Sequence, residues 1–193
     1  MDQTLQFYEE NTQDFVSRTL TADMGEAQQR FLFYIAPGAQ ILDLGCGAGR
    51  DSISFQEHGY HVEAVDGSPA LCAVASKLLG KPVRQLLFED LDYKNAFDAV
   101  WASASLLHVP SASMTSILKK IWAALKPQGV FYSSVKRGDF EGERNGRYFT
   151  DYTEDRLCGL LTDCGFLILE QWTNEDVRPE RSEFFVNVIA RKS

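Results

Sequence analysis

The chain lacks an apolar run long enough to cross a bilayer, since a transmembrane helix needs about 20 consecutive apolar residues. Its N-terminal stretch, MDQTLQFYEENTQDF, is acidic and polar, without the apolar centre of a secretory signal. From these two absences we predict a soluble, cytoplasmic protein that does not associate with membranes.

Positive charge is also scarce. The 193 residues include 19 Lys and Arg against 27 Asp and Glu, which gives a formal net charge of -8 at pH 7. A polyanion such as DNA or RNA would meet a repulsive average field around this protein. Nucleic acid is therefore disfavoured as a partner. An RNA substrate would need a local basic face, and the sequence contains no cluster of Lys and Arg that predicts one.

Residues that bind metals or form disulfides are few and scattered. There are three His, and the four cysteines are Cys46, Cys72, Cys158 and Cys164. None of them forms a close C-x-x-C pair, and no histidine cluster accompanies them, so the signature of a zinc site or a disulfide framework is missing. We expect four reduced, mostly buried cysteines and no metal.

What the chain does contain is an alternation of apolar runs and helical patterns. Strands are predicted at 41–44, 61–65, 84–88, 97–102, 129–135, 166–172 and 184–190. Strand and helix alternating over this length predict an α/β protein with a doubly wound, mostly parallel sheet and helices on both faces. Only a polar loop joins the last two runs, so we expect them to form an antiparallel pair at one side of the sheet.

Several helix boundaries are visible in the sequence. Ser68 before Pro69 is a start signal, because serine caps a helix and proline suits its first position. Residues 112–126 carry apolar side chains at helical spacing, and a further helix is predicted at 153–164. Residues 1–35 are predicted to form two or three short helices that cap a site, and 36–193 to form the core of the same single domain.

The stretch ILDLGCGAGRDS, residues 41–52, places Gly45, Gly47 and Gly49 directly after the first strand. Doubly wound sheets bind ligands at this place, and glycine lets a ligand approach the backbone. The G-x-G-x-G spacing differs from the G-x-G-x-x-G of dinucleotide sites. Asp43 would also repel a pyrophosphate but suit a cationic amine, which argues against a nucleotide-dependent oxidoreductase. Alternatively, Asp43 simply caps the glycine turn.

Acidic residues also end the next two predicted strands. Asp66 can accept hydrogen bonds from both hydroxyls of a ribose, or it can cap the helix that follows. Glu89 and Asp90 can accept from an exocyclic amine such as that of adenine, or they belong to a solvated turn. Acids at three successive strand ends thus suit a ligand with amine, ribose and adenine parts.

The segments LDLGCGAGRDS, AVDGS, FEDL, FDAVWASASLLHV and ALKPQGVFYSSV, in this order, resemble class I S-adenosylmethionine-dependent methyltransferases. The resemblance implies a Rossmann-like seven-stranded sheet with one antiparallel strand near its edge. It further implies that S-adenosylmethionine packs on the glycine loop, that Asp66 binds its ribose, and that Tyr8 covers it. The adenine would lie at Asp90 and Leu91. The candidate cofactor-binding residues are Tyr8, Asp43, Gly45, Cys46, Gly47, Arg50, Asp66, Gly67, Ser68, Glu89, Asp90, Leu91, Ala102 and Ser103.

Within this class, the GCGAGRDS loop and the compact size are similar to the tellurite-resistance methyltransferases. No substrate can be carried over from that group, because RGDFEGERNGRYFTDYTED matches no substrate motif that we can assign. Residues 136–150 mix cations with acids, which is typical either of a solvated loop or of a lid that closes on an anionic substrate. The candidate substrate-binding residues are Phe15, Arg137, Arg147, Tyr148 and Tyr152.

His108 follows the fourth strand in LLHVPS, where groups that face the substrate occur in this fold. Histidine titrates near neutrality and can act as a general base, although a structural role is equally open. The predicted activity is in-line methyl transfer from S-adenosylmethionine to an unidentified small-molecule acceptor by a monomer or weak homodimer. A base is needed only if the acceptor must lose a proton. A non-catalytic S-adenosylmethionine-binding protein and an RNA methyltransferase remain alternatives.

Overall fold

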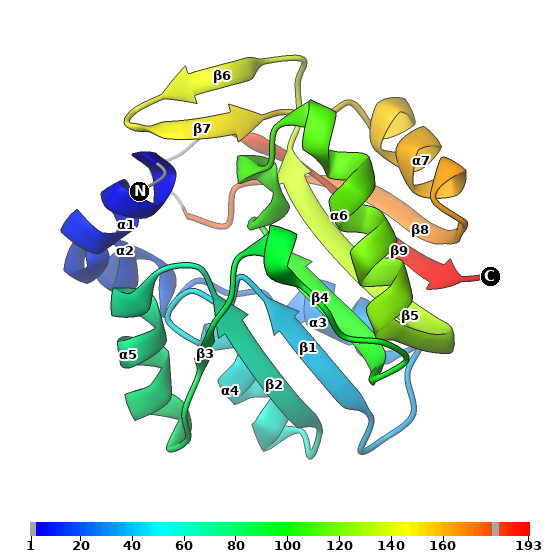
Figure 1. Ribbon diagram of the computed structural model, residues 1–193, viewed down its shortest axis with the longest axis horizontal. Helices are drawn as coiled ribbons and strands as arrows, with labels where there is room; N and C mark the ends of the chain where they lie inside the picture. The colour runs from blue at the N-terminus through cyan, green and yellow to red at the C-terminus, as the bar shows by residue number, and fades with distance from the viewer. Residues whose placement is uncertain (1–2, 179–181) are drawn as a thin grey trace.

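The computed structural model of the protein describes residues 3–178 and 182–193, and its centre is a seven-stranded sheet (Figure 1). The strand order is β3-β2-β1-β4-β5-β9-β8. The strands are β1 (Gln40–Leu44), β2 (His61–Asp66), β3 (Arg84–Gln85), β4 (Phe97–Ser103), β5 (Leu125–Lys136), β8 (Phe166–Glu175) and β9 (Phe184–Lys192). Strands β1 to β5 pair in parallel, whereas β9 is antiparallel to both β5 and β8. The predicted Rossmann-like sheet, with one antiparallel strand near its edge, is confirmed.

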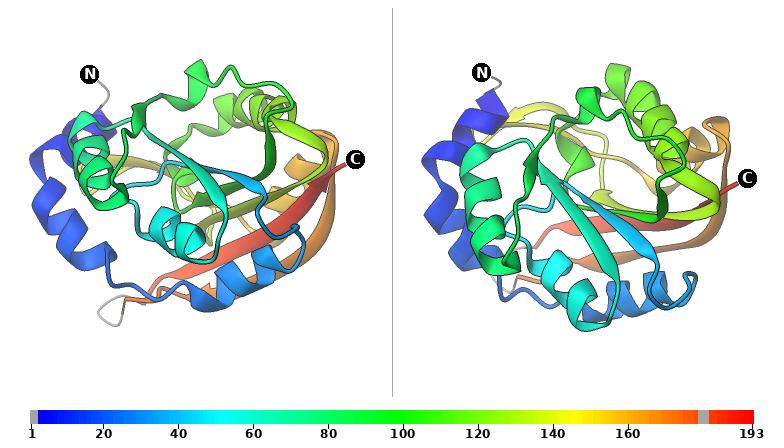
Figure 2. Two further views of the ribbon diagram at one scale, coloured as in Figure 1. Left: turned by 90° about the horizontal axis from the view of Figure 1, so that it is seen from below. Right: turned by 60° about the horizontal axis from the view of Figure 1, so that its bottom comes forward.

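Helices cover both faces of the sheet, and Figure 2 shows the layers from two further directions. One face carries α3 (Gly25–Leu32), α4 (Arg50–Glu57) and α5 (Pro69–Leu79), and the other carries α6 (Ser111–Ala124) and α7 (Glu154–Asp163). Neighbouring residues of a strand point to opposite faces. Trp101 therefore packs with Phe31 of α3 on one side, while Val100 packs with Ile117 of α6 on the other.

Two elements end earlier than the sequence predicts. Strand β3 stops at Gln85 instead of residue 88, and the amide of Leu86 still bonds to the Asp66 carbonyl of β2 at 2.9 Å. The 3-10 helix η1 (Phe88–Asp90) follows. Helix α6 ends at Ala124 instead of residue 126, and the backbone of Leu125 is already extended as β5 begins. The proline at 127 favours this early end, since the residue before a proline disfavours helical geometry.

Two further pieces of chain lie where the parallel strands end at their carboxyl termini. They are the helix pair α1 (Gln3–Glu10) and α2 (Thr12–Thr19), and a hairpin of β6 (Glu141–Arg144) and β7 (Arg147–Thr150), seen together at the upper left of Figure 1. The hairpin replaces the loop expected at 136–150. Its turn consists of Asn145 and Gly146 with φ of 53° and 75°, and an Asn-Gly pair is the strongest short signal for such a turn.

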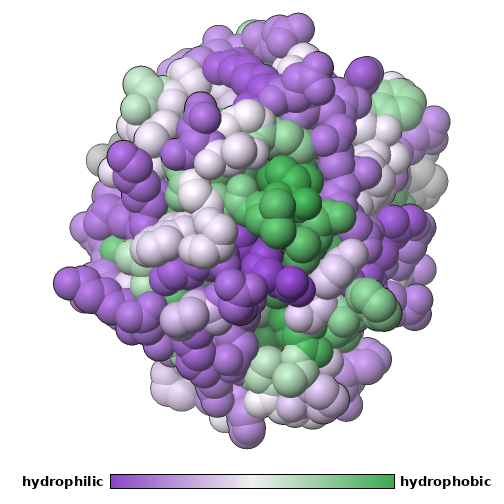
Figure 3. Space-filling view, turned by 90° about the vertical axis from the view of Figure 1, so that its right-hand side faces the viewer, coloured by the Kyte–Doolittle hydropathy of each residue, from purple (hydrophilic) through white to green (hydrophobic). Residues whose placement is uncertain are grey.

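The side of the molecule drawn in Figure 3 is chiefly hydrophilic. Figure 3 shows the side that lies at the right of Figure 1, where hydrophobic residues gather near the centre of the view. Strand β8 forms the edge of the sheet, and its Leu167 is 58% exposed. Among the described residues, no helix combines the length and the apolar character that a bilayer crossing requires. Of the four cysteines, Cys72 and Cys164 are buried and Cys46 and Cys158 are partly buried.

Candidate active site

A cavity of about 760 Å³ lies at the carboxyl ends of the parallel strands. Doubly wound sheets bind ligands at this position, and the volume falls in the range of roughly 300–1,000 Å³ typical of small-molecule sites. Helices α1 and α2, the loops after β1, β2 and β4, strand β7 and the β8–β9 connection all contribute to its lining. Segments that are distant in the sequence therefore share one cavity.

The glycine loop after β1 is held tightly by protein neighbours. Gly45 has a φ of 78°, and a β-carbon at this position would lie 2.4 Å from Cβ of Ser105. Gly47 has a φ of 56°, and a β-carbon there would lie 3.2 Å from the ring of Phe15. Both glycines line the cavity. Close packing of the β1 loop against the β4 turn and α2 thus explains these two glycines without any ligand.

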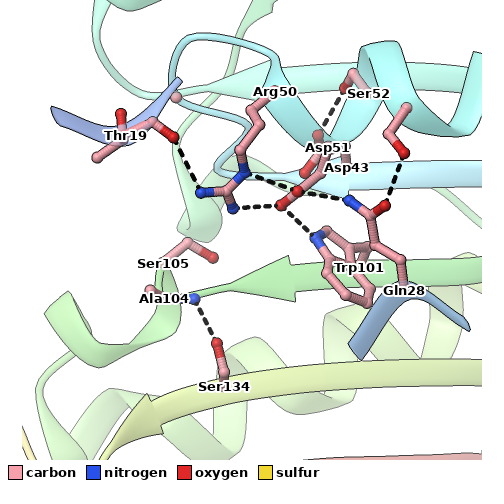
Figure 4. A network of polar contacts seen from close by, with 12 residues as sticks. Thr19, Gln28, Asp43, Arg50, Asp51, Ser52, Trp101, Ala104, Ser105 and Ser134 are labelled. Atoms are coloured by element: carbon pink, nitrogen blue, oxygen red, sulfur yellow. Dashed lines mark hydrogen bonds and ion pairs between the residues drawn. The ribbon is translucent and has the colours of Figure 1, made fainter. Parts of the chain in front are cut away.

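The β4 turn is itself an unusual piece of backbone. Ala104 has a φ of 50°, which is rare for a residue with a β-carbon. Its amide donates to Oγ of Ser134 at 2.9 Å, and Figure 4 shows this bond beside Ser105. Backbone strain of this kind is found at ligand sites. Ser103, a predicted cofactor residue, lines the cavity here, whereas the adjacent Ala102 is fully buried behind it.

Asp43, at the end of β1, is a buried carboxylate that lines the cavity. Oγ of Ser52 donates a hydrogen bond to it at 2.6 Å (Figure 4). Burial and the nearby Asp51 raise the pKa of Asp43 to about 8. Among the described residues no cation is in ion-pair contact with Asp43. A ligand ammonium group beside this carboxylate would offset the cost of burying its charge.

Arg50 and Asp51 form the second part of the network in Figure 4. Nη2 of Arg50 lies 2.8 Å from Asp51, and Nη1 donates to the carbonyl of Thr19 at 3.2 Å. The buried Asp51 also accepts hydrogen bonds from the side chains of Trp101 and Gln28. Arg50 therefore lines the cavity as predicted, but its guanidinium also ties the end of α2 to the start of α4.

Asp66, at the end of β2, is bound by two backbone amides. Its carboxylate accepts from the amide nitrogens of Gly47 and Ser68, both at 2.8 Å. Burial raises the pKa of Asp66, and these hydrogen bonds oppose the shift. Asp66 and Gly67 line the cavity, while Ser68 is fully buried and caps α5 by accepting from the amide of Leu71.

Of the remaining cofactor candidates, some line the cavity and others lie outside its lining. Cys46 of the glycine loop and Glu89 line it, together with the apolar Leu87 and Phe88. Asp90 is exposed outside the lining, and Leu91 is buried in the core with its amide bonded to the carbonyl of Phe88. A role of Asp90 and Leu91 at the cofactor stays a prediction from the resemblance.

At the other end of the cavity, Tyr8 and His108 are hydrogen-bonded. Oη of Tyr8 lies 2.8 Å from Nε2 of His108, and Nδ1 of His108 lies 2.6 Å from the carbonyl oxygen of Tyr148. Burial raises the pKa of Tyr8, while the guanidinium of Arg147 opposes the shift. Phe15 stands 5.0 Å from the Tyr8 ring, so the two aromatic rings connect the glycine loop to His108.

The substrate candidates are only partly brought together. Phe15 and Arg147 line the cavity. Arg137 instead pairs with Glu154 at 2.8 Å on the surface, and the hydroxyl of Tyr148 donates to Glu141. The 1% exposed Tyr152 belongs to the hydrophobic core. The hairpin pairing of β6 with β7 decides this division, since it turns Arg147 inward and leaves Arg137 beyond the hairpin.

Sequence reasoning missed several lining residues, among them Lys136, Asn174, Arg178 and Asn187. Only Asn187 had a visible signal, as a polar residue inside the apolar run FFVNVIA. It is buried, accepts from the Tyr132 hydroxyl at 2.8 Å and donates to Asn174. The others are ordinary surface-type residues: Lys136 reaches the cavity at the end of β5, and Asn174 and Arg178 reach it from β8 and the β8–β9 connection.

Comparison with known proteins agrees with this geometry. Residues 41–129 match the methyltransferase domain family. The chain is 33% identical over 124 residues to an uncharacterised methyltransferase of Synechocystis sp. (strain ATCC 27184 / PCC 6803 / Kazusa), covering 60% of this chain and 58% of that protein. It is 40% identical over 108 residues to the ubiquinone biosynthesis O-methyltransferase of Xanthomonas axonopodis pv. citri, covering 52% and 44%. The chain thus spans about half the length of these curated relatives.

Solved structures match over more of the chain. One is the 1,6-didemethyltoxoflavin-N1-methyltransferase of Burkholderia thailandensis, bound to 1,6-didemethyltoxoflavin and S-adenosylhomocysteine. It is 27% identical with a TM-score of 0.80, and the match covers 98% of this chain and 87% of that one. A methyltransferase from Methanosarcina mazei, 23% identical with a TM-score of 0.74 over 83% of this chain and 95% of that one, shares the fold.

Fold, cavity position and these matches place the chain among the class I S-adenosylmethionine-dependent methyltransferases. More narrowly, residues 41–129 are similar to the methyltransferase domain family, and the similar structure from Burkholderia thailandensis holds S-adenosylhomocysteine, the form that S-adenosylmethionine takes after it has given up its methyl group. The lining fits this cofactor, because buried carboxylates at Asp43 and Asp66 suit an ammonium group and ribose hydroxyls.

Proposed function

We propose that the protein transfers a methyl group from S-adenosylmethionine to a heteroatom of a small-molecule acceptor. The observation that carries this proposal is the continuity of the cavity. It reaches from Asp43 and Asp66 at the glycine loop to His108 and Arg147 beneath the hairpin, so cofactor and acceptor would share one space. A volume of about 760 Å³ lies in the range typical of small-molecule sites.

When bound, S-adenosylmethionine supplies an electrophilic methyl group on a positively charged sulfur. The residues of the chain then have three tasks, which are to hold the two ligands in line, to exclude water and to accept any proton that the acceptor loses. Phe15 and Tyr8 cover the cavity from above the glycine loop, and the Tyr8–His108 pair lies at the acceptor end.

The relatives support a small acceptor without fixing its identity. One acts on a nitrogen of 1,6-didemethyltoxoflavin, and others are O-methyltransferases of ubiquinone biosynthesis. For this chain we propose a nitrogen or oxygen acceptor of similar size. A protein that only senses S-adenosylmethionine would have no use for polar groups such as His108 and Asn187 at the far end of the cavity.

Calorimetric titration with S-adenosylmethionine, S-adenosylhomocysteine and NAD tests the first half of this proposal. We expect the first two to bind and NAD to fail. Formation of S-adenosylhomocysteine in the presence of nitrogen and oxygen acceptors, including 1,6-didemethyltoxoflavin, tests the second half. Binding of the cofactor with no turnover on any acceptor would favour the non-catalytic alternative, and transfer to RNA would contradict the small-molecule assignment.

A further inference from the structure

Three side chains at the acceptor end of the cavity form a chain of contacts. Tyr8 of α1 bonds to Nε2 of His108 at 2.8 Å, and Nη1 of Arg147 donates to the Tyr8 hydroxyl at 3.4 Å. A carbonyl oxygen can only accept, so the bond to the Tyr148 carbonyl places a proton on Nδ1 of His108. In neutral His108, Nε2 is then the acceptor, and the Tyr8 hydroxyl donates to it.

Arg147 has a hydrogen bond to Tyr8 but no carboxylate partner among the described residues, whereas Arg144 of the same hairpin pairs with Asp151 at 2.9 Å. The guanidinium lies instead 4.4 Å from the ring of Phe7 and 5.1 Å from that of Phe149. Its Nε is buried and has no hydrogen-bond partner. A guanidinium held between apolar rings is a strong site for an anion.

Charge is distributed unevenly along the cavity. At the glycine-loop end the carboxylates Asp43 and Asp66 line the cavity, and the cation Arg50 there is paired with Asp51. The other end is lined by the cations Lys136, Arg147 and Arg178, together with the carboxylate of Asp176. Lys136 pairs with Glu183, and Arg178 pairs with Asp176. The charged groups that act on the Tyr8 hydroxyl are Arg147, Asp66 and Arg178. Arg147 is therefore the cation whose charge a ligand can balance.

We propose that the methyl acceptor is a small acidic compound with a phenol-type hydroxyl or a ring N–H, which binds beside Arg147 in its neutral form and is converted there to its anion. This inference rests on the proposed function and names the substrate class of the same site. The acceptor passes its proton to the Tyr8 oxygen while the Tyr8 hydroxyl proton moves to Nε2 of His108. Tyr8 is thereby restored, the acceptor carries a negative charge, and His108 becomes an imidazolium that later releases its proton to solvent.

The test uses 4-nitrophenol, a phenol whose absorbance reports its own ionisation, bound to the complex of the protein with S-adenosylhomocysteine. We expect bound 4-nitrophenol to ionise at a lower pH than in water. Substituting Arg147→Gln should raise the apparent pKa of the bound probe by about one unit or more, because an opposite charge at this distance favours the anion. Arg147→Lys retains the charge and should retain most of the effect.

Arg156→Gln is the matched control, since Arg156 is exposed on α7 and lies outside the cavity lining. It should leave ionisation of the probe unchanged. Equal ionisation in the wild type and in Arg147→Gln would overturn the inference, and so would failure of the probe to bind the S-adenosylhomocysteine complex. A protein that does not bind S-adenosylhomocysteine at all would instead contradict the proposed function, so the two failures are distinguishable.

A second measurement addresses the proton path. Nitrogen-15 spectra of histidine-labelled protein, bound to S-adenosylhomocysteine, should show the neutral ring of His108 with a protonated Nδ1 and an unprotonated Nε2. Tyr8→Phe should shift the Nε2 resonance, because it removes the hydrogen bond to that atom. A protonated Nε2 in the wild type would exclude His108 as the proton acceptor.

Discussion

Gly45 and Ser105 are in such close contact that a side chain on residue 45 has no room. A β-carbon on Gly45 would lie 2.4 Å from Cβ of Ser105, nearer than such atoms approach in proteins. The contact joins the loop after β1 to the turn after β4, and both residues line the cavity. The geometry of the cofactor loop therefore depends on a residue sixty positions further along the chain.

Gly45→Ala should destabilise the protein because it adds both a steric overlap and a strained φ. We expect a loss of about 2–4 kcal/mol in the free energy of unfolding, measured in urea. Gly38→Ala separates the two causes, since Gly38 also has a positive φ of 75° but a β-carbon there would meet no atom within 4 Å. A loss as small as that of Gly38→Ala would show that Ser105 can move aside.

Asp43→Asn should change how stability depends on pH. Burial and Asp51 raise the pKa of Asp43 to about 8 in the folded protein, above its ordinary value near 3.8. The folded state therefore binds the proton more tightly, and this group makes the unliganded protein less stable as pH rises from about 4 to 8. The variant should be more stable than the wild type at pH 8 by at least about 1.4 kcal/mol, the value of one pKa unit.

Urea unfolding at pH 5 and pH 8 measures this difference, and Asp139→Asn, at an exposed position, should leave the profile unchanged. The same Asp43→Asn variant should bind S-adenosylhomocysteine more weakly, because it cannot pair with the ammonium group. A variant that is less stable than the wild type at pH 8 would show that the Asp43 carboxylate finds compensation in the folded state.

Asp66→Ala should lower the affinity for S-adenosylmethionine by about 1–3 kcal/mol through the loss of hydrogen bonds. Part of the effect will come from the protein itself, since Asp66 also holds the amides of Gly47 and Ser68. Calorimetry on the variant, with unfolding measured alongside, separates the two contributions. Asp92→Ala serves as the control because Asp92 is a surface residue, 3.9 Å from Arg84. Unchanged affinity in Asp66→Ala would remove Asp66 from the site.

Glu9→Gln should loosen the cover formed by α1. Oε1 of Glu9 accepts from the hydroxyl of Ser68 and from the amide of Ala70, which fastens α1 to the start of α5. Replacing the charged acceptor by a neutral one should weaken these contacts by about 1 kcal/mol and speed the release of S-adenosylhomocysteine about fivefold. Stopped-flow release and hydrogen exchange over α1 measure the effect.

Glu10→Gln is the matched control for that experiment, because the neighbouring Glu10 is exposed and accepts only from Gln6 of its own helix among the contacts described. Identical release rates for Glu9→Gln and the wild type would mean that other contacts hold α1 in place. The bond between the amide of Tyr148 and the hydroxyl of Thr4 would then be the next to test.

Much of the sheet and the cofactor end of the site could be predicted, because their signals are local. An apolar run followed by glycines marks β1 and its loop, and acids at strand ends mark Asp43 and Asp66. The Asn-Gly pair at 145–146 was an equally local signal, and the mixed charges around it obscured the hairpin. At the acceptor end, His108 had a local signal in its position after the fourth strand, whereas nothing near Arg147 in the sequence distinguishes it from Arg137, which lies outside the cavity lining.

The sequence by itself determined the alternation of strand and helix, the parallel sheet and the loop that faces the cofactor, because periodicity and turn chemistry act over a few residues. Only the tertiary structure decided which polar side chains share the cavity. Arg147 meets Tyr8 and His108 through the register of a hairpin and the docking of α1, and both depend on contacts between distant segments. The hydrogen bonds among Tyr8, His108 and Arg147 then determine which of these side chains donates a proton and which accepts one.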